Sequence, residues 1–473
     1  MDLKITFLAQ DIEKARIWNA ISDKLQERGL EVNFVTYSKE CYLFFTKKSK
    51  ECIYLAGEID KYKIKGDLKK HLAEIEEKYK IPSLELLLIG DLEHSRMKRE
   101  KAYTIMIKHF YFWEDYLQKN KIDFIIGDIE RFVNMIPKAV CKKHKTRYIS
   151  LLLDPLPGRF SISEDVSGHH SALDEYWEKN KDRKLTEKER KNATRFIRSF
   201  RRRLERAFVL GSKPKINIQK VKFFLDRARV SLFIEKGKFP YMDVSGGTYR
   251  HLLKMVRANL AKKYYSKFDP NEKYVFYPLH DFTDAQILVR APQYINQLYV
   301  VENISRSLPA GYQLYVKEHP NAMGGTPLKD LKKIAGLPNV KLLSPFENSL
   351  RIIKSSACIV TINSTVGWEA LLLKKPIINL GKVFYETSGL TYPLRDLYRL
   401  PETIRLALRV NPIKEDILTK FVNAVFAETY PGDILRTTLY WSDTTRSEII
   451  LQDGNIKKVS EGICNQLKQW GYK

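Results

Sequence analysis

The chain has 473 residues and a formal net charge of +26 at pH 7. Its hydrophobic content of 44%, with 12% aromatic residues, is ample for globular packing and excludes a wholly disordered chain. The length exceeds what one ordinary core supports, so we expect two domains. The five cysteines form no C-x-x-C pair, which argues against a disulfide framework or a zinc site and favours a reducing cytoplasm. They are Cys41, Cys52, Cys141, Cys358 and Cys464.

The positive charge permits three interpretations. A solvated basic surface accounts for part of the excess, binding to nucleic acid is the second interpretation, and attraction to an anionic membrane leaflet or an acidic glycan is the third. No RNA-binding or DNA-binding motif accompanies the charge, so we expect no specific nucleic acid partner. The first strand-like run, Met1–Leu8, is too short for a signal peptide, and no later run is long enough to span a bilayer. We therefore expect a cytoplasmic protein, soluble or peripheral on the inner face of the membrane.

Apolar runs alternate with amphipathic stretches through the first part of the chain. We expect strands at Lys4–Leu8, Glu31–Tyr37, Leu86–Ile89, Phe124–Ile126 and Tyr148–Leu153, and helices at Glu13–Arg28, Lys101–Lys119 and Ile136–His144. This alternation of strands and helices predicts a parallel sheet wound with helices.

The pattern changes to long, basic, helical stretches from about residue 176 to residue 267. The charge is densest at Arg195–Arg206, where a solvated helix face and a working basic surface are about equally well supported. A basic helical insertion would suit docking on acidic lipid or polymer, and Asp243–Gly247 reads as a turn that breaks the stretch. We expect a first domain over residues 1–175, an insertion over 176–269, a second domain over 270–430 and a helical tail over 431–473.

A second series of strands and helices follows the basic region. We expect strands at Lys273–Pro278, Gln313–Val316, Val340–Leu343, Cys358–Ile362 and Pro376–Leu380, and helices at Pro292–Ser307, Leu328–Ala335, Phe346–Ser355, Val366–Leu373 and Val459–Trp470. Its regular spacing predicts a second doubly wound, Rossmann-type domain. Two such domains facing each other across a cleft form the GT-B fold of sugar transferases, which two-domain epimerases share, so the fold alone leaves the function open.

Polar residues follow two strands of this second series. His319 comes directly after one strand, and Asn363, Ser364 and Thr365 lie between another strand and an apolar helix. Carboxyl ends of strands and amino ends of helices hold anionic ligands, so these residues could converge on one phosphate. A lone histidine is more often structural, and helix capping alone would explain the three polar residues.

Neighbouring residues extend this candidate nucleotide site. Gly367 would let a ligand approach the first helical turn closely, and Glu369 on the same turn could accept ribose hydroxyl hydrogen bonds or complement the helix dipole. His280 ends the first strand of the second series, and Lys317 would add positive charge near the phosphates. Asp281 and Asp284 form a weak D-x-x-D pattern, and we expect neither a metal nor a cofactor.

A transfer reaction also needs a general base for the acceptor hydroxyl, or a carboxylate nucleophile. Asp128 and Asp154 are the favoured candidates because both close strands of the first series. Glu130, Asp165 and the pair His169-His170 are further candidates, and each carboxylate alone is more often a turn residue.

These segments also resemble a known family, the capsule polysaccharide biosynthesis proteins, which include bacterial transferases that add 3-deoxy-D-manno-octulosonic acid (Kdo) from its CMP donor. Leu314–Pro320 looks like the family's histidine–proline motif, Val360–Ala370 with Lys375-Pro376 and Leu380-Gly381 looks like its serine/threonine motif and following strand, and Tyr277–His280 resembles the start of its second domain. The resemblance covers about residues 274–385 and implies a GT-B transferase in which His319 and the Ser364-Thr365 turn hold the donor phosphate.

The resemblance is thin outside that stretch. Leu156–Phe160 resembles a family segment, but the acidic residue expected shortly before it is replaced by Leu152 or displaced to Asp154. The usual proline–glutamate pair after His280 is Thr283-Asp284. These departures leave the catalytic base and the transferred sugar open.

Three functional hypotheses follow. The preferred one is a metal-independent glycosyltransferase that moves a sugar from a nucleotide donor, CMP-linked in the favoured case, to a glycan or lipid-linked acceptor of a surface polysaccharide. The second is a nucleotide-sugar epimerase or a teichoic-type polyol-phosphate transferase. The third is a polyanion-binding or nucleic-acid-binding protein without chemistry, which the motifs after the strands disfavour.

Overall fold

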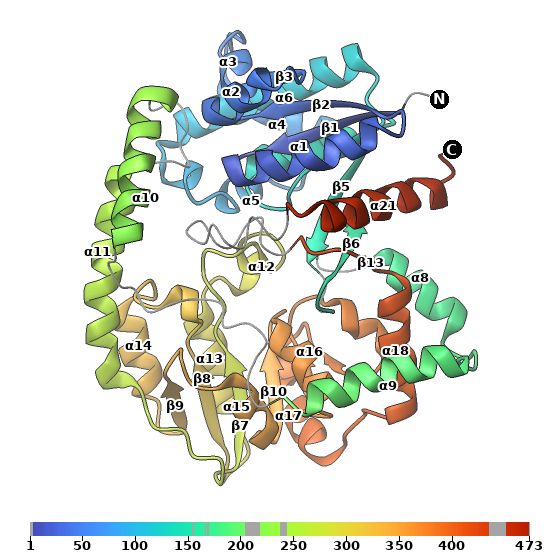
Figure 1. Ribbon diagram of the computed structural model, residues 1–473. Coiled ribbons are helices and arrows are strands. Elements are labelled where there is room, and N and C mark those ends of the chain that lie inside the picture. Colours follow the sequence, from blue (N-terminus) through green and yellow to red (C-terminus); the bar gives the residue numbers. More distant parts are fainter. Residues whose placement is uncertain are drawn as a thin grey trace. The chain divides into compact units, whose positions relative to one another are not determined.

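Two β-sheets organise the chain in this computed structural model, one in each of two units (Figure 1). The structure describes residues 3–153, 156–165, 167, 170–203, 218–236, 244–434 and 451–472. The first unit comprises Met1–Glu164, Ile216–Gly247 and Thr429–Lys473, and the second comprises Asp165–Lys215 and Thr248–Glu428. Residues 176–269, expected as an insertion, are thus divided between the units, and the expected tail belongs to the first unit.

The first unit has a seven-stranded sheet in the order β13-β6-β5-β4-β1-β2-β3. Its strands are β1 (Lys4–Ala9), β2 (Glu31–Thr36), β3 (Cys52–Tyr54), β4 (Phe124–Ile126), β5 (Arg147–Leu153), β6 (Arg159–Ser163) and β13 (Tyr430–Pro431). Its helices are α1 (Ile12–Gln26), α2 (Lys39–Lys47), α3 (Leu55–Ile59), α4 (Leu68–Tyr79), α5 (Leu84–Ile89), α6 (Arg99–Asn120), α7 (Phe132–Cys141), α10 (Ile218–Arg229) and α21 (Asp453–Gln469). Strands β1 to β5 pair in parallel, and β6 and β13 add an antiparallel edge.

The second unit has a six-stranded sheet in the order β12-β11-β10-β7-β8-β9, with every pair parallel. Its strands are β7 (Tyr274–Pro278), β8 (Gln313–Lys317), β9 (Val340–Leu343), β10 (Cys358–Thr361), β11 (Ile377–Asn379) and β12 (Tyr392–Pro393). Its helices are α8 (Ser171–Asn180), α9 (Glu187–Arg201), α12 (Ala285–Leu288), α13 (Gln297–Ser307), α14 (Leu328–Ala335), α15 (Ser349–Ser355), α16 (Thr365–Leu372), α17 (Leu400–Arg409), α18 (Glu415–Ala427) and most of α11 (Val244–Ala261).

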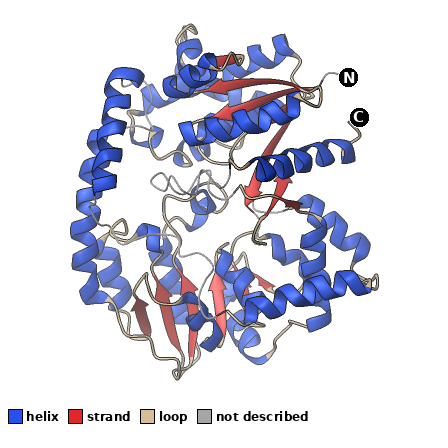
Figure 2. Ribbon diagram, in the orientation of Figure 1, coloured by secondary structure: helices blue, strands red, loops and turns tan. Residues whose placement is uncertain are grey.

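Helices flank both sheets, so the central strands are buried on both faces (Figure 2). In β1, Phe7 lies in one hydrophobic core and the adjacent Leu8 lies in another. Strands buried in this way read as continuous apolar runs, which is why most of them were predictable from the sequence. The expected α/β class with two Rossmann-type, doubly wound units is confirmed, and two such units are the domain content of the GT-B class.

Two local predictions are wrong. Leu86–Ile89, expected as a strand, lies in helix α5, where Ser83 caps the helix and Leu84 and Leu88 are buried one turn apart. A short apolar run without alternation does not distinguish a strand from a buried helical turn. The expected turn at Asp243–Gly247 is also wrong over its described part, because the residues from Val244 onward form the start of helix α11, and Asp243 lies outside the described residues.

The basic region is held by specific contacts. Helix α9 buries Ala193, Ile197 and Phe200 along one face, and Arg201 pairs with Glu415 while its Nε donates to the Leu372 carbonyl (2.7 Å). Part of the charge run is therefore packed structure rather than a free basic surface. Within the described ranges, the structure has no helix whose length and hydropathy would let it cross a membrane.

Candidate functional site

The carboxyl edge of the second sheet brings four residues to one level. Strand β7 pairs with β8 on one side, where Pro278 lies opposite Lys317, and with β10 on the other side, where Phe276 lies opposite Ile359. When these registers are continued beyond the strand ends, His280 is level with His319 and with Asn363. The β10–β11 register adds Gly381, whose N–H donates to the Ile362 carbonyl (2.9 Å). Residues from four separate stretches of sequence thus form a row.

This row crosses the switch point of the sheet. The chain places β8 and β9 on one side of β7 and then returns to add β10, β11 and β12 on the other side. Parallel α/β sheets bind ligands at the carboxyl ends of the strands where the order reverses in this way. His280 and Asn363 follow the two strands, β7 and β10, that border the switch point.

His280 is a buried, neutral imidazole in this row. Its backbone is fixed by Gln297 of α13, which accepts from the His280 N–H (2.7 Å) and donates to its carbonyl (3.0 Å). Burial, together with a smaller effect of the nearby His319, lowers the pKa of His280 to about 3. Its Nε2 atom is buried and has no hydrogen-bond partner among the described residues.

His319 is half-buried and begins a short 3-10 helix, Pro320–Ala322. Its Nδ1 accepts a hydrogen bond from the backbone N–H of Asn321 (3.2 Å). A neutral imidazole with Nδ1 as acceptor carries its proton on Nε2. The contact at Nδ1 confirms the structural role of His319, and its role as a donor to a phosphate stays a prediction.

Lys317 and Glu318 directly precede this histidine in the chain. Both side chains are buried. Burial raises the pKa of the Glu318 carboxyl, and the charge of Lys317 offsets only part of this rise. The Tyr265 hydroxyl donates to Glu318 Oε2 (2.5 Å). Lys317 is thus a buried lysine rather than an exposed one, and its role near a phosphate stays a prediction.

The turn after β10 both caps a helix and presents polar groups. Ser364 is the N-cap of α16, and its hydroxyl accepts from the Val366 N–H (3.2 Å), as the capping explanation requires. Thr365 is exposed. The Asn363 amide donates to the Gln286 carbonyl of α12 (2.8 Å), while its buried Oδ1 has no hydrogen-bond partner among the described residues.

Two expectations about α16 are wrong. A Cβ atom at Gly367 would collide with the Tyr385 hydroxyl, so the glycine admits this tyrosine rather than a ligand. Glu369 is the fifth residue of α16 and lies beyond its first turn, so it is not a first-turn carboxylate that complements the dipole.

The Asp281 and Asp284 carboxylates serve local turns. Asp281 accepts from the Thr283 N–H (3.0 Å) and hydroxyl (2.8 Å), and Asp284 caps α12 through the Gln286 N–H (2.9 Å). Among the described residues, no group of three or more histidine, cysteine or acidic side chains is placed to hold a metal ion.

In the first unit, Asp128 follows β4 at the corresponding switch point, between β1 and β4. Its carboxylate forms an ion pair with the buried ammonium of Lys14, and its carbonyl accepts from the Tyr148 hydroxyl (2.7 Å). Lys14 lies in the first turn of α1, which Asp11 caps (2.8 Å). Asp154, the other predicted base, lies outside the described residues.

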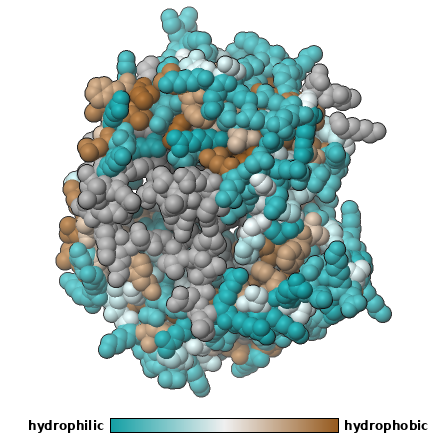
Figure 3. Space-filling model, viewed as in Figure 1, coloured by the Kyte–Doolittle hydropathy of each residue, from teal (hydrophilic) through white to brown (hydrophobic). Residues whose placement is uncertain are grey.

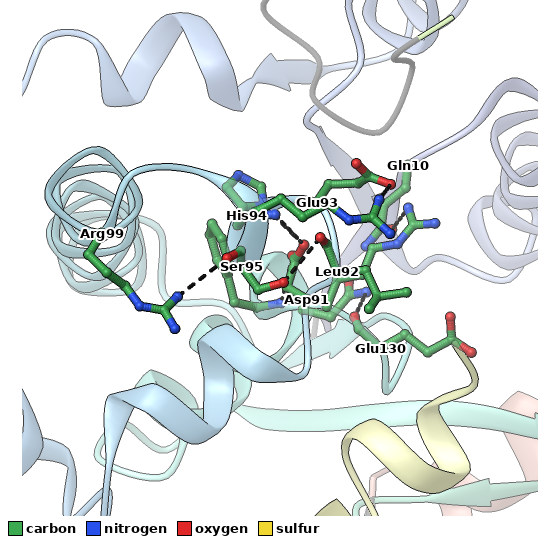
Figure 4. A network of polar contacts seen from close by, with 12 residues as sticks. Gln10, Asp91, Leu92, Glu93, His94, Ser95, Arg99 and Glu130 are labelled. Carbon is green, nitrogen blue, oxygen red and sulfur yellow. Dashed lines mark hydrogen bonds and ion pairs between the residues drawn. The ribbon is translucent and has the colours of Figure 1, made fainter. Parts of the chain in front are cut away.

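A buried polar network holds the loop that carries Asp128 (Figure 4). The Asp91 carboxylate, which is fully buried, accepts from the Phe132 N–H (3.2 Å) at the start of α7 and from the His94 N–H (3.1 Å), and it contacts His94 Nδ1 (3.1 Å). On the same loop, Arg131 adopts a positive φ of 66° and donates to Gln10 Oε1 (3.1 Å) after β1. These contacts tie the loop after β4 to the end of β1.

One protein family is similar to the part of the chain that contains the candidate donor site. The family model described as capsule polysaccharide biosynthesis protein matches residues 199–400, which include His280, His319 and Asn363. The match covers less than half of the chain, and this segment is similar to the capsule polysaccharide biosynthesis family. The expectation drawn from the three motifs is thereby confirmed, and the family segment contains the entire candidate donor site of the second unit.

Two curated proteins are similar to parts of the chain. Protein FixF of Sinorhizobium fredii (strain NBRC 101917 / NGR234) is 30% identical over 186 residues, which cover 38% of this chain and 42% of FixF. The capsule polysaccharide export protein KpsS of Escherichia coli is 30% identical over 152 residues, which cover 30% of this chain and 38% of KpsS. The chain thus spans well under half of the length of these relatives.

Solved structures share lower similarity. The Thermosulfurimonas dismutans KpsC, a β-Kdo 2,4 transferase, is 14% identical, with a TM-score of 0.39 over 70% of this chain and 88% of the other. The Methanocaldococcus jannaschii UDP-GlcNAc 2-epimerase in complex with UDP-GlcNAc and UDP is 12% identical, with a TM-score of 0.26 over 90% of this chain and 99% of the other.

Several residues of the first unit were not anticipated from the sequence. Lys14, Arg131 and the Asp91–His94 pair all organise the switch point of the first unit. A usable signal existed for Lys14, because Asp11-x-x-Lys14 follows a strand and opens a helix. Asp91 and His94 follow the segment mistaken for a strand, so their place beside α7 was hidden by that error.

Two buried histidines predict a loss of stability in acid. Burial lowers the pKa of His109, with its neighbour His94 adding to the shift, and that of His280, each to about 3. Unfolded histidine titrates near about pH 6.5, so below that pH the unfolded state binds protons that the folded state does not. Each histidine should therefore cost about 1.4 kcal/mol of unfolding free energy per pH unit, or about 2 kcal/mol at about pH 5.

Denaturant unfolding of the wild type and of His109→Leu at neutral pH and near pH 5 measures this effect. The wild-type first unit should lose about 2 kcal/mol more than the variant between the two conditions. Asp91, whose charge opposes the shift at His109, is unchanged in the variant, so it affects both proteins alike. Equal losses would contradict the prediction.

Proposed function

We propose that this chain is a metal-independent glycosyltransferase of capsular or other surface polysaccharide synthesis. It would take a nucleotide-activated sugar, CMP-linked in the favoured case and carrying Kdo or a related acidic sugar. The observation that carries the proposal is the row of His319, His280 and Asn363 at the switch point of the second sheet. Two of these three side chains keep a buried polar atom, His280 Nε2 and Asn363 Oδ1, without a partner among the described residues.

These residues can stabilise a departing nucleotide without a metal. His319 would donate Nε2–H to a phosphate oxygen, and the amino end of α16 at Ser364 and Thr365 would supply backbone dipoles to the same anion. Lys317 would add positive charge from behind. Fixed donors of this kind act where the leaving-group charge develops, which is the usual source of catalysis when no metal is present. Glu369 remains a proposed contact to the nucleoside.

The acceptor would be a glycan or a lipid-linked glycan. Asp128 is the proposed general base, and its ion pair with Lys14 would have to loosen before the carboxylate could take a proton. The net charge of +26 supports work at the anionic inner face of a membrane, where an acidic lipid-linked acceptor would collect.

Thermal unfolding in the presence of CMP, UDP or GDP tests the proposal. A ligand bound only by the folded state, at about a hundred times its Kd, adds about 2.7 kcal/mol and should raise the Tm of the second unit by several degrees. We expect CMP to give the largest rise. No shift with any of the three nucleotides would refute the donor site. Conversion of a nucleotide sugar to its epimer without any acceptor would instead identify an epimerase.

A further inference from the structure

Helix α11 exposes an apolar stripe to solvent. Tyr249, Leu252, Val256 and Leu260 follow one another at intervals of three or four residues, so they lie on one face of the helix. Their exposed fractions are 64%, 50%, 57% and 48%. In the space-filling view, apolar residues in brown are visible along the edge that α11 occupies in Figure 1 (Figure 3).

The stripe is not the face by which α11 packs on the second unit. Ala258 and Ala261 are buried, and Ala261 belongs to the main core of that unit. A Cβ atom at Gly324 would collide with the Lys254 carbonyl, so the α11 backbone lies directly on this glycine. On a helix of 3.6 residues per turn, Ala258 and Ala261 fall on the side away from the stripe.

The charge of α11 has a single sign. Its sequence contains Arg250, Lys254 and Arg257 and no aspartate or glutamate, and Lys262 and Lys263 follow directly. On the helix, the positions of Arg250 and Arg257 lie along one side of the apolar stripe, whereas that of Lys254 lies toward the packing face. An exposed apolar stripe with basic residues beside it is typical of helices that lie in the plane of a membrane surface. Basic residues next to such a stripe are attracted to anionic headgroups.

We propose that α11 is a membrane-docking helix that lies on an anionic lipid surface and inserts Tyr249, Leu252, Val256 and Leu260 into the headgroup–acyl boundary. The inference names the surface responsible for the membrane association included in the proposed function, and it is independent of the donor site. Three of the four residues in the stripe are aliphatic and cannot stack on bases, which disfavours nucleic acid as the occupant. The excess of basic residues favours anionic lipid over a neutral protein surface.

Vesicle flotation of the full chain tests the inference. Wild-type protein should float with phosphatidylcholine vesicles that contain phosphatidylglycerol and much less with phosphatidylcholine alone. Leu252→Ser/Leu260→Ser should weaken binding to the anionic vesicles by about tenfold or more, because the variant lacks two exposed leucines that would insert into the lipid. Leu406→Ser/Val410→Ser is the matched control, since these residues of the same unit are 48% and 50% exposed and should leave binding unchanged.

Three results would overturn the inference. The first is equal flotation of the wild type and the Leu252→Ser/Leu260→Ser variant. The second is self-association of the wild type in sedimentation without lipid, if the variant abolishes it. The stripe would then be an interface between two copies of the chain. The third is binding to random oligonucleotides that the variant loses in parallel with lipid binding. The Tm shift with nucleotide should persist in the variant, so failure of membrane docking and failure of the donor site remain distinguishable.

Discussion

Replacing His319 with alanine should weaken nucleotide binding by about 10- to 100-fold while the second unit stays folded. A hydrogen bond to a charged partner contributes about 1.5–3 kcal/mol, and the Nε2–H of His319 is the group proposed to make that bond to the phosphate. The other ring nitrogen of His319, Nδ1, accepts a hydrogen bond from the Asn321 N–H (3.2 Å) at the start of a short 3-10 helix. Loss of that contact at a half-buried position should affect stability little.

Calorimetric titration of the nucleotide that gives the largest Tm shift measures the effect. His319→Asn is the matched control, because its Oδ1 can still accept from the Asn321 N–H while its shorter side chain cannot place a donor where Nε2 lies. If nucleotide binding depends on the Nε2–H group, His319→Asn should bind the nucleotide as weakly as His319→Ala does. Full affinity in His319→Asn would mean that only the cap matters, and full affinity in His319→Ala would remove the donor-site assignment.

Most strands of both sheets could be predicted because they are buried on both faces and read as apolar runs, whereas the short or peripheral strands β3, β6, β12 and β13 were not predicted. Phe124–Ile126 and Val340–Leu343 occur with the expected bounds, and so does helix Leu328–Ala335. The same reliance on apolar runs explains the wrong prediction at Leu86–Ile89. Leu86–Ile89 is equally apolar, but burial in a helix requires only Leu84 and Leu88 on one face, and composition does not separate these cases.

The candidate site was predictable in its residue types and not in its geometry. The sequence places His280, His319 and Asn363 after strands, but their common level depends on the pairing registers of β7, β8 and β10. Strands far apart in the chain set these registers, and no local pattern reports them. The error at Gly367 is similar, since the glycine is explained by Tyr385, a residue from a later turn.

Replacing Asp91 with alanine should lower the unfolding free energy of the first unit by about 3 kcal/mol or more. Its carboxylate is fully buried and accepts from two backbone N–H groups, those of His94 and Phe132, besides contacting the His94 ring. Removing one member of a buried polar or ionic network leaves its partners without compensation, at a cost of about 3–5 kcal/mol for a buried pair. Chemical denaturation measured at neutral pH gives the difference.

Asp67→Ala provides the matched comparison. Asp67 caps α4 in the same unit by accepting from the Lys69 N–H (2.9 Å), but this hydrogen bond is exposed to solvent. An exposed cap of this kind contributes about 1 kcal/mol, because water replaces the lost acceptor. Asp91→Ala should therefore cost several times more than Asp67→Ala. Equal costs would mean that the start of α7 is satisfied without Asp91, and the loop carrying Asp128 would then need another support.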